Sequence, residues 1–328
     1  MAKRQKRISV TQKIWLEAKE RINKHENNIT RKNYTLWFRY YLKFARENFN
    51  VRSLSDCADI KILQTYADKL LAEGKTASTI HSYISAVCSV CGVSFMHEIK
   101  KPKRHTAEYT KGREPKKRDY YNSKYEADDP RWKYLIDFQK KVGLRRRELF
   151  CLKGCDLLYD ESGNLCVRVQ KGKGGKMQLQ RLCDGDEEEI RIYFHGLGKD
   201  EYVFPRELFR NALDLHRFRR EAAKKFYNEQ LFKINNEPGY ADKLTAEVKL
   251  RWSTYNIDKK TGKPKPFDEK LITGVYVLRG KNKEYALEHG LPLYYNKLAV
   301  LATSIFKLSH WRLNVCLQSY LNVEKGCT

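Results

Sequence analysis

The sequence predicts a mainly α-helical protein with a small antiparallel β-sheet, divided into an N-terminal helical domain and a larger mixed α/β domain. Apolar residues recur at helical spacing between residues 29 and 95, a basic stretch poor in apolar residues follows, and a later segment alternates apolar and polar residues around a glycine-rich turn. A chain of 328 residues is long enough for two domains. We place the helical domain at residues 1–98, a linker at 99–118 and the second domain at 119–328.

The N-terminal domain is predicted to be a bundle of short helices. Thr30 is a candidate N-cap for the first, Glu73 and Gly74 end the second, and the third lies in TASTIHSYISAVCSVCGVSF. The apolar stripes of the first two helices are Tyr34, Trp37, Phe38, Tyr41, Leu42 and Phe44, and then Ile60, Leu63, Tyr66, Ala67 and Leu70. We expect this bundle to bind a partner rather than to carry catalytic residues.

The linker, EIKKPKRHTAEYTKGREPKKRD from Glu98 onward, is rich in Lys and Arg. This composition cannot bury a core, and a solvated connection is the default interpretation of such a charge run. Because it lies between two basic domains, it can also follow the phosphates of a duplex. The linker residues expected to contact DNA are Lys100, Lys101, Lys103 and Arg104.

The second domain is predicted to combine helices with a β-hairpin. GLRRRELFCLKGCDL indicates a helix after a glycine turn, and NLCVRVQKGKGGKMQLQRL indicates a hairpin that turns at Gly172–Gly175. NALDLHRFRREAAKKFYNEQL is typical of a helix, with Asn211 as candidate cap. ITGVYVLRG predicts a strand and YYNKLAVLATSIFKLSHW a buried helix, whereas residues 232–270 are polar and show no clear pattern.

The formal net charge of +25 is the strongest compositional feature. A surplus of this size usually persists because a polyanion neutralises it, so double-stranded DNA is the first candidate partner and an anionic membrane surface the second. We expect no membrane partner, because no run of eighteen apolar residues occurs and MAKRQKRISV leads into polar residues, unlike a signal peptide. We expect a cytoplasmic, nucleoid-associated protein.

Nine cysteines are present, an odd number. Cys88 and Cys91 form a CxxC pair, but no second pair or nearby HxxxH completes a zinc site. Their spacing falls within an apolar helical pattern, where small buried thiols are common. We therefore expect reduced, structural cysteines and no metal.

Five segments resemble, in order, the sequence boxes of the tyrosine recombinases, the family of phage integrases, Xer-type resolvases and transposon integrases. TASTIHSYISAV resembles the closing helices of their N-terminal, SAM-like core-binding domain, and GLRRREL resembles their first box. GKGGK resembles their β-hairpin lysine, HRFR their H-x-x-R box, and LSHWR followed by a Tyr their terminal box. The resemblance covers nearly the whole chain and implies a tyrosine recombinase catalytic domain at 119–328.

The resemblance assigns Arg145 and Arg219 to the non-bridging oxygens of a scissile phosphate, where guanidinium groups stabilise the added negative charge. Lys173 matches the general acid for the departing 5′ oxygen, and His310 would donate to the phosphate. Tyr320 matches the nucleophile; the alternative is a core aromatic. Further implied contributors are Glu148, which orients catalytic groups, Trp311, which packs beside His310, and Arg146, Lys171 and Lys176, which contact DNA; the two lysines are also the rivals of Lys173.

The second box has two candidates. His216 and Arg219 lie three apart, on one face of a helix, with His216 as acceptor of the tyrosine proton. Tyr276 and Arg279 in VYVLRG have the same spacing, but a strand would point them to opposite faces, so we favour the first pair. The cost is a long gap between Arg219 and His310, which implies an insertion at about 230–290.

The resemblance implies a site-specific recombinase, or integrase, that cleaves and rejoins DNA through a covalent 3′-phosphotyrosyl intermediate. It implies a homo-oligomer, four protomers on two duplexes passing through a Holliday junction, and the integration or excision of a mobile genetic element. The phosphotyrosyl bond conserves energy, so no cofactor, ATP or metal is expected. The alternatives are a catalytically inactive DNA-binding regulator and an enzyme resembling type IB topoisomerases.

Overall fold

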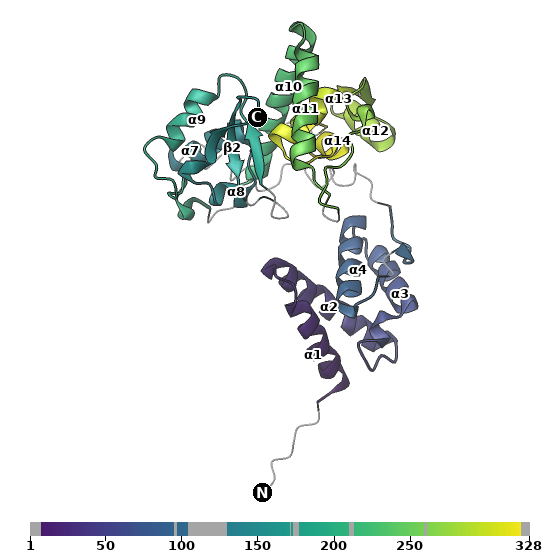
Figure 1. The fold of residues 1–328 in the computed structure, drawn as a ribbon. Helices are drawn as coiled ribbons and strands as arrows, with labels where there is room; N and C mark the ends of the chain where they lie inside the picture. Colours follow the sequence, from purple (N-terminus) through teal and green to yellow (C-terminus); the bar gives the residue numbers. More distant parts are fainter. Residues whose placement is uncertain are drawn as a thin grey trace. The chain divides into compact units, whose positions relative to one another are not determined.

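The computed structural model describes residues 8–94, 97–103, 130–170, 172, 177–209, 213–258 and 261–322. The chain divides into two units, Met1–Glu108 and Tyr109–Thr328, each with its own hydrophobic core and each mostly helical (Figure 1). Most of the predicted linker lies outside the described residues. None of the described helices has the length and apolar character needed to cross a bilayer.

The described part of the N-terminal unit includes the helices α1 (Val10–Asn23), α2 (Asn28–Asn48), α3 (Ile60–Ala72) and α4 (Ala77–Cys91). Each begins at a side-chain cap, on Ser9, Asn27, Asp59 and Thr76 respectively. The prediction that Thr30 caps α2 is wrong. The extended backbone of Asn27 lets its side chain accept from the amides of Ile29 and Thr30, so the helix begins before Thr30.

The core of this unit is aromatic and contains buried thiols. The predicted stripes of α2 and α3 supply Phe38, Tyr41 and Leu63, all fully buried. Tyr41 Oη donates to the Cys57 carbonyl at 2.6 Å, and burial raises the pKa of this phenol. Burial also raises the pKa of Cys57 to about 12, which keeps the thiol protonated and unreactive. Every cysteine of the described segments is a free thiol.

One sheet of the second unit is three-stranded and antiparallel, in the order β1 (Leu157–Tyr159), β2 (Leu165–Val169), β3 (Gln178–Arg181). Val169 pairs with Gln178, so the predicted hairpin is confirmed. Its Lys-bearing turn, apart from Gly172, lies outside the described residues.

Helix α7 (Pro130–Val142) packs against the long helix α10 (Leu215–Asn236). Between α7 and the short α8 (Arg146–Phe150) the chain turns at Gly143, whose φ is +74°. A Cβ there would lie 2.9 Å from Cβ of Ala222 on α10, so only glycine fits this close approach. Helix α10 follows Asp214; Asn211, the predicted cap, lies outside the described residues.

The segment without a clear sequence pattern contains the end of α10 and a further helix, α11 (Tyr240–Tyr255). Helices α10 and α11 lie side by side (Figure 1). The pattern was weak because α11 buries only a narrow stripe: Leu244, Val248, Arg251 and Trp252. The predicted strand is β4 (Val275–Val277), which pairs with β5 (Tyr294–Asn296) on either side of α12 (Gly280–Glu288).

The last part of the described chain is buried and only partly α-helical. Helix α13 (Lys297–Ala302) runs into a π-helical turn, η7 (Thr303–Lys307), and α14 (Leu313–Cys316) runs into a second, η8 (Leu317–Leu321). The predicted buried helix is therefore present, with a change of helical pitch. The chain also includes the short helices α9 (Glu187–Phe194) and η5 (Arg206–Phe209).

Candidate functional site

Tyr320 lies on η8 and is 3% exposed. Its phenol oxygen is 3.1 Å from Nε2 of His310, within hydrogen-bond distance. The ring of His216, on α10, has its centroid 5.4 Å from that of Tyr320, and the guanidinium carbon of Arg219 lies 5.7 Å from the Tyr320 ring centroid. The fold thus gathers one phenol, two imidazoles and a guanidinium from segments about a hundred residues apart.

Arg145 joins the same cluster from the N-cap position of α8. Its Nη2 lies 3.3 Å from Nε2 of His310, while its Nη1 donates to Glu148 Oε1 at 2.6 Å. Nε2 of His310 therefore faces both the Arg145 guanidinium and the Tyr320 phenol. In the tautomer in which Nε2 carries no hydrogen, its single lone pair can take the phenol hydrogen. The hydrogen-bond contact described above joins the phenol to His310, whereas the resemblance assigned the role of proton acceptor to His216.

Glu148 connects the two arginines. Its Oε2 accepts from the Arg145 backbone amide at 2.8 Å and lies 3.8 Å from Arg219 Nη1, and its side chain is only 3% exposed. One buried carboxylate therefore holds two guanidinium groups in fixed positions. The orienting role of Glu148 in catalysis stays a prediction.

Arg219 is completely buried. Its Nη2 donates to the Leu308 carbonyl at 2.8 Å and its Nη1 to the Gly143 carbonyl, so it joins the turn after α7 to the segment that carries His310. Burial lowers the pKa of Arg219, an effect that nearby Tyr320 opposes. Its Nε has no partner within the described part of the chain, and a buried donor without an acceptor is a candidate ligand for an anion.

His310 lies between two residues with left-handed backbone, Ser309 at φ +52° and Trp311 at φ +54°. Such a conformation is costly for a residue as bulky as Trp and persists only where neighbouring contacts enforce it. Ser304 supplies those contacts: its carbonyl accepts from the His310 amide at 2.8 Å, and its hydroxyl accepts from the Arg312 amide at 3.3 Å.

Lys307 is a fully buried cation three residues before His310. Its Nζ donates to the carbonyls of Arg181, at 3.0 Å, and Lys141, which joins η7 to the end of β3 and to α7. Burial lowers the pKa of Lys307. A lone Lys within an otherwise apolar run was the only sequence signal for this residue.

The β-hairpin is joined to α11 by a buried ion-pair network. Oδ2 of Asp160 accepts from Arg181 Nε at 2.6 Å and from Arg251 Nη2 at 2.7 Å, and the Asp160 side chain is fully buried. The guanidinium of Arg181 stacks 3.6 Å from the Phe306 ring centroid on η7. Helix α11, in the predicted insertion, thus supports β3, one of the two strands between which GKGGK falls in the sequence. Lys171, Lys173 and Lys176 themselves lie outside the described residues.

Two predicted contributors are placed away from the phenol. Trp311 packs on Trp252 of α11, with ring centroids 5.9 Å apart, so it anchors the His310 segment to the core. Arg146 donates to the carbonyls of Phe209, at 3.2 Å, and Leu213. It therefore holds a loop, and its contact with DNA stays a prediction.

The described lysines of the linker differ from one another. Lys100 and Lys103 are exposed. The Lys101 Nζ is buried without a partner among the described residues, and burial lowers its pKa. The backbone here lies along α3 and α4, because Gln64 bonds the Lys100 backbone and His81 lies 3.1 Å from the Pro102 carbonyl. Lys101 is thus poorly placed to contact phosphate; Arg104 lies outside the described residues.

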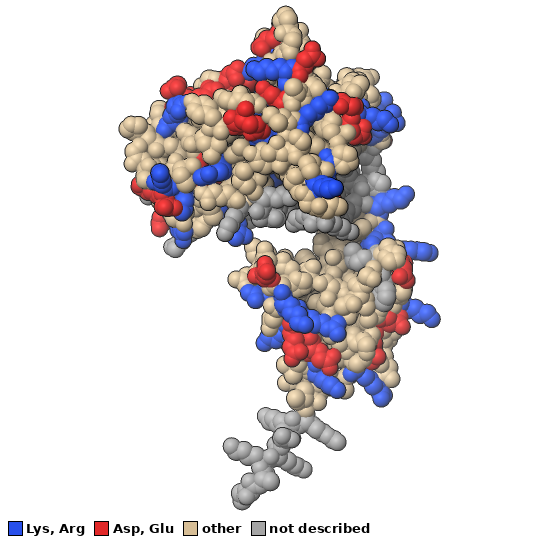
Figure 2. Space-filling model, viewed as in Figure 1, with Lys and Arg blue, Asp and Glu red and all other residues tan. Residues whose placement is uncertain are grey.

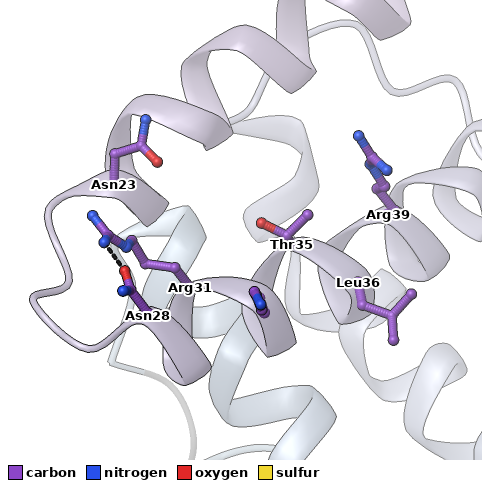
Figure 3. A pocket seen from close by; sticks show the side chains of 7 residues that line it. Asn23, Asn28, Arg31, Thr35, Leu36 and Arg39 are labelled. Carbon is purple, nitrogen blue, oxygen red and sulfur yellow. Dashed lines mark hydrogen bonds between the residues drawn. The ribbon is translucent and has the colours of Figure 1, made fainter.

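A groove of about 450 Å³ follows the end of α1 and the first half of α2 in the N-terminal unit. Figure 3 shows Arg31 hydrogen-bonded to Asn28, with Asn23 and Arg39 on the same groove. The remaining lining residues are Lys32, Thr35 and Leu36. On the face shown in Figure 2, the Lys and Arg side chains of each unit lie among Asp and Glu. The groove thus carries amide and guanidinium side chains, which are the kinds that DNA-binding proteins use to contact phosphates and base edges.

Within the described ranges, no group of three or more His, Cys, Asp or Glu is arranged to hold a metal ion. Sequence reasoning predicted the glycine turn at Gly143 but not its close approach to α10. It missed Ser304, Lys307 and the Asp160 network, which act by positioning other groups. Apart from the lone Lys, no local pattern marks these three, since their partners are distant in sequence.

Comparison with known proteins gives little beyond this geometry. No family model and no curated protein matches the sequence. Among solved structures, the chain resembles one described as a XerA recombinase, with 16% sequence identity, coverage of 66% of this chain and 85% of that chain, and a TM-score of 0.23. A likeness at that score carries no argument about fold or activity.

Proposed function

We propose that this protein is a site-specific DNA recombinase in which Tyr320 is the nucleophile. The phenol oxygen attacks a DNA phosphorus and forms a 3′-phosphotyrosyl bond, while the bond to the 5′ oxygen breaks. The 5′ hydroxyl of another strand then attacks the phosphotyrosine and releases Tyr320. The single observation that carries the proposal is the contact of the Tyr320 oxygen with His310, beside two guanidinium groups held by one carboxylate.

The phenol must lose its proton to attack. An ordinary phenol has a pKa of about 10, so a neighbouring base is needed at neutral pH. In the proposed mechanism His310 is neutral with Nε2 unprotonated, and this nitrogen, 3.1 Å from the Tyr320 oxygen, receives the proton. Lys173 donates a proton to the departing 5′ oxygen, and His216 assists at the phenol or the phosphate.

Negative charge accumulates on the non-bridging oxygens as the phosphorus becomes five-coordinate. Fixed guanidinium groups in a desolvated site stabilise such charge without reorganisation. Arg145 supplies a partly exposed guanidinium, 22% exposed, and Arg219 supplies its unpartnered Nε. Glu148 keeps both from collapsing onto the phenol when no DNA is bound.

The N-terminal unit would grip the duplex through the groove of α1 and α2, so affinity should be salt-sensitive. Exchange between two duplexes requires four active sites, so the proposed active form is a homotetramer on DNA. Integration or excision of a mobile element is the role that such a reaction serves.

A nicked suicide duplex tests the proposal. The wild-type protein should trap a denaturant-resistant protein–DNA adduct, and Tyr320→Phe should form none. Tyr294→Phe is a matched control, because Tyr294 is 63% exposed and lies on β5. Wild-type protein that binds the duplex without an adduct would be an inactive regulator. If the wild-type protein forms the adduct and relaxes supercoiled DNA, but does not join new strands, the chemistry is topoisomerase-like.

The assignment of the histidines has its own test. His310→Gln should slow adduct formation more than His216→Gln, and Tyr276→Phe should have no effect. Loss of cleavage in Tyr276→Phe alone would overturn our choice of the second box.

A further inference from the structure

An open pocket of about 540 Å³ lies on the second unit, beside α8. It is lined by Arg146, Arg147 and Phe150 of α8 and by Arg206 and Phe209 of η5. Residues 146, 147 and 150 share one face of the helix by their spacing, whereas Glu148 is buried with Arg145. The proposed cleavage chemistry does not use this pocket.

The pocket offers aromatic surfaces that are not fully packed. Phe150 and Phe209 are half-buried and meet edge to face, with ring centroids 5.6 Å apart. The guanidinium of Arg206 lies 4.9 Å from the Phe150 ring centroid and 4.7 Å from that of Tyr202, whose hydroxyl it bonds at 2.7 Å. A planar cation therefore already stacks over Phe150, and a planar ligand can take the same position or extend the stack.

The charge of the lining is of one sign. None of the five lining residues is acidic. Arg146 is committed to two carbonyls and forms part of the wall, but Arg147 is exposed and has no ion-pair partner in the described segments. The pocket thus combines an aromatic face with two accessible guanidinium groups. This combination fits a ligand that is flat at one end and anionic at the other.

We propose that this pocket binds one unpaired nucleotide of DNA, with the base against Phe150 and a phosphate on Arg147 and Arg206. Aromatic side chains and basic groups together are how proteins hold single-stranded nucleic acid without reading its sequence. The volume lies within the range of small-ligand pockets, roughly 300–1,000 Å³. An acidic peptide with an aromatic side chain is the rival that the binding test below distinguishes.

The site would matter for strand exchange because bases next to a nick must leave their stack before they pair with a new strand. Arg146 and Arg147, which line the pocket, directly follow the proposed catalytic Arg145 at the start of α8. An unpaired base held in the pocket would therefore lie near the reacting strand. Only this consequence rests on the proposed function. Nucleotide binding by itself does not.

The test measures the affinity of Tyr320→Phe protein for a fluorescent single-stranded oligonucleotide and for the corresponding duplex. This background separates binding from cleavage chemistry. The paired change Arg147→Ser and Arg206→Ser should weaken single-strand binding at least about tenfold, because both cations on the phosphate are lost. Duplex binding should change less than about twofold. Arg191→Ser is the matched control, because Arg191 also stacks on a tyrosine, Tyr159, and bonds its hydroxyl at 2.7 Å.

Phe150→Leu gives a second, independent variant, which removes the flat face but keeps an apolar side chain. It should quench less of the signal of a 2-aminopurine base placed in the single strand. Equal losses for single strand and duplex would overturn the proposal, as would pocket variants that behave like Arg191→Ser. Tighter binding of an acidic, tyrosine-containing peptide than of the oligonucleotide would also overturn it.

Discussion

Replacing Glu148 by Gln removes the only negative charge found between Arg145 and Arg219 in the described structure. Glu148 makes a 2.6 Å contact with Arg145 Nη1, accepts from the Arg145 amide at 2.8 Å and lies 3.8 Å from Arg219 Nη1. Gln has nearly the same shape, but its amide NH2 would point hydrogens at guanidinium groups, which are themselves donors. Two guanidinium groups, one of them fully buried, then lose their counter-charge.

Removing one partner of a buried ion pair costs about 3–5 kcal/mol. For a domain of 150–250 residues, each kcal/mol lowers the unfolding midpoint by roughly 2–4 °C. We therefore expect the midpoint of the second unit to fall by about 6–20 °C. We also expect the rate of adduct formation on the suicide duplex to fall at least about tenfold, which corresponds to ~1.4 kcal/mol of transition-state stabilisation.

The assays are thermal unfolding and single-turnover trapping of the adduct. Glu188→Gln is the control, because Glu188 is 90% exposed and pairs with Arg191 at 3.5 Å, so its loss should leave both measurements unchanged. An unfolding midpoint and a trapping rate for Glu148→Gln that both match wild type would refute the idea that this carboxylate holds the two arginines.

Other predictions follow from the buried charges and the tight turn. Burial acts to raise the pKa of Asp160, but Arg181 and the hydrogen bonds from Asn164 outweigh it and the net pKa is lowered. The stability that Asp160 contributes is therefore fully present above pH 3.8, its ordinary pKa, and is lost as the pH falls below that value. Asp160→Asn should lower the urea midpoint of unfolding at pH 7, and the difference from wild type should narrow below pH 4. Lys101→Met should raise the unfolding midpoint, because it removes a buried ammonium without a described partner, and this gain should shrink as the pH approaches 10.5. The same change should leave DNA affinity unchanged, and weaker binding would mean that the ammonium reaches phosphate. Gly143→Ala should destabilise the second unit by ~1–3 kcal/mol in denaturant titrations, and an unchanged midpoint would show that α7 and α10 can separate without cost.

Much of the secondary structure follows from local pattern. The stripes of α2 and α3 were predicted correctly because each helix buries one face against a core. The strands β2, β3 and β4 were predicted from their apolar residues and pair as strands, although β3 is buried throughout and β4 is largely exposed. Helix α11 was missed because its buried stripe is narrow and includes an arginine. The cap of α2 was misplaced because Thr30 and Asn27 are both good cap residues, and backbone conformation chose Asn27.

The sequence by itself determined which chemical groups are available: a phenol, two imidazoles and a strong excess of cations, in an order that resembles one family. Tertiary structure alone decided that Tyr320 touches His310, that Glu148 serves two arginines, and that Arg219 is fully buried. Glu148 and the carbonyls of Gly143 and Leu308 meet Arg219 from segments about 70 to 90 residues away, and the π-helical turn brings Tyr320 back onto His310. Side-chain spacing along a helix or strand specifies which neighbours share a face, but only the packing of α7, α10 and η8 brings distant faces together.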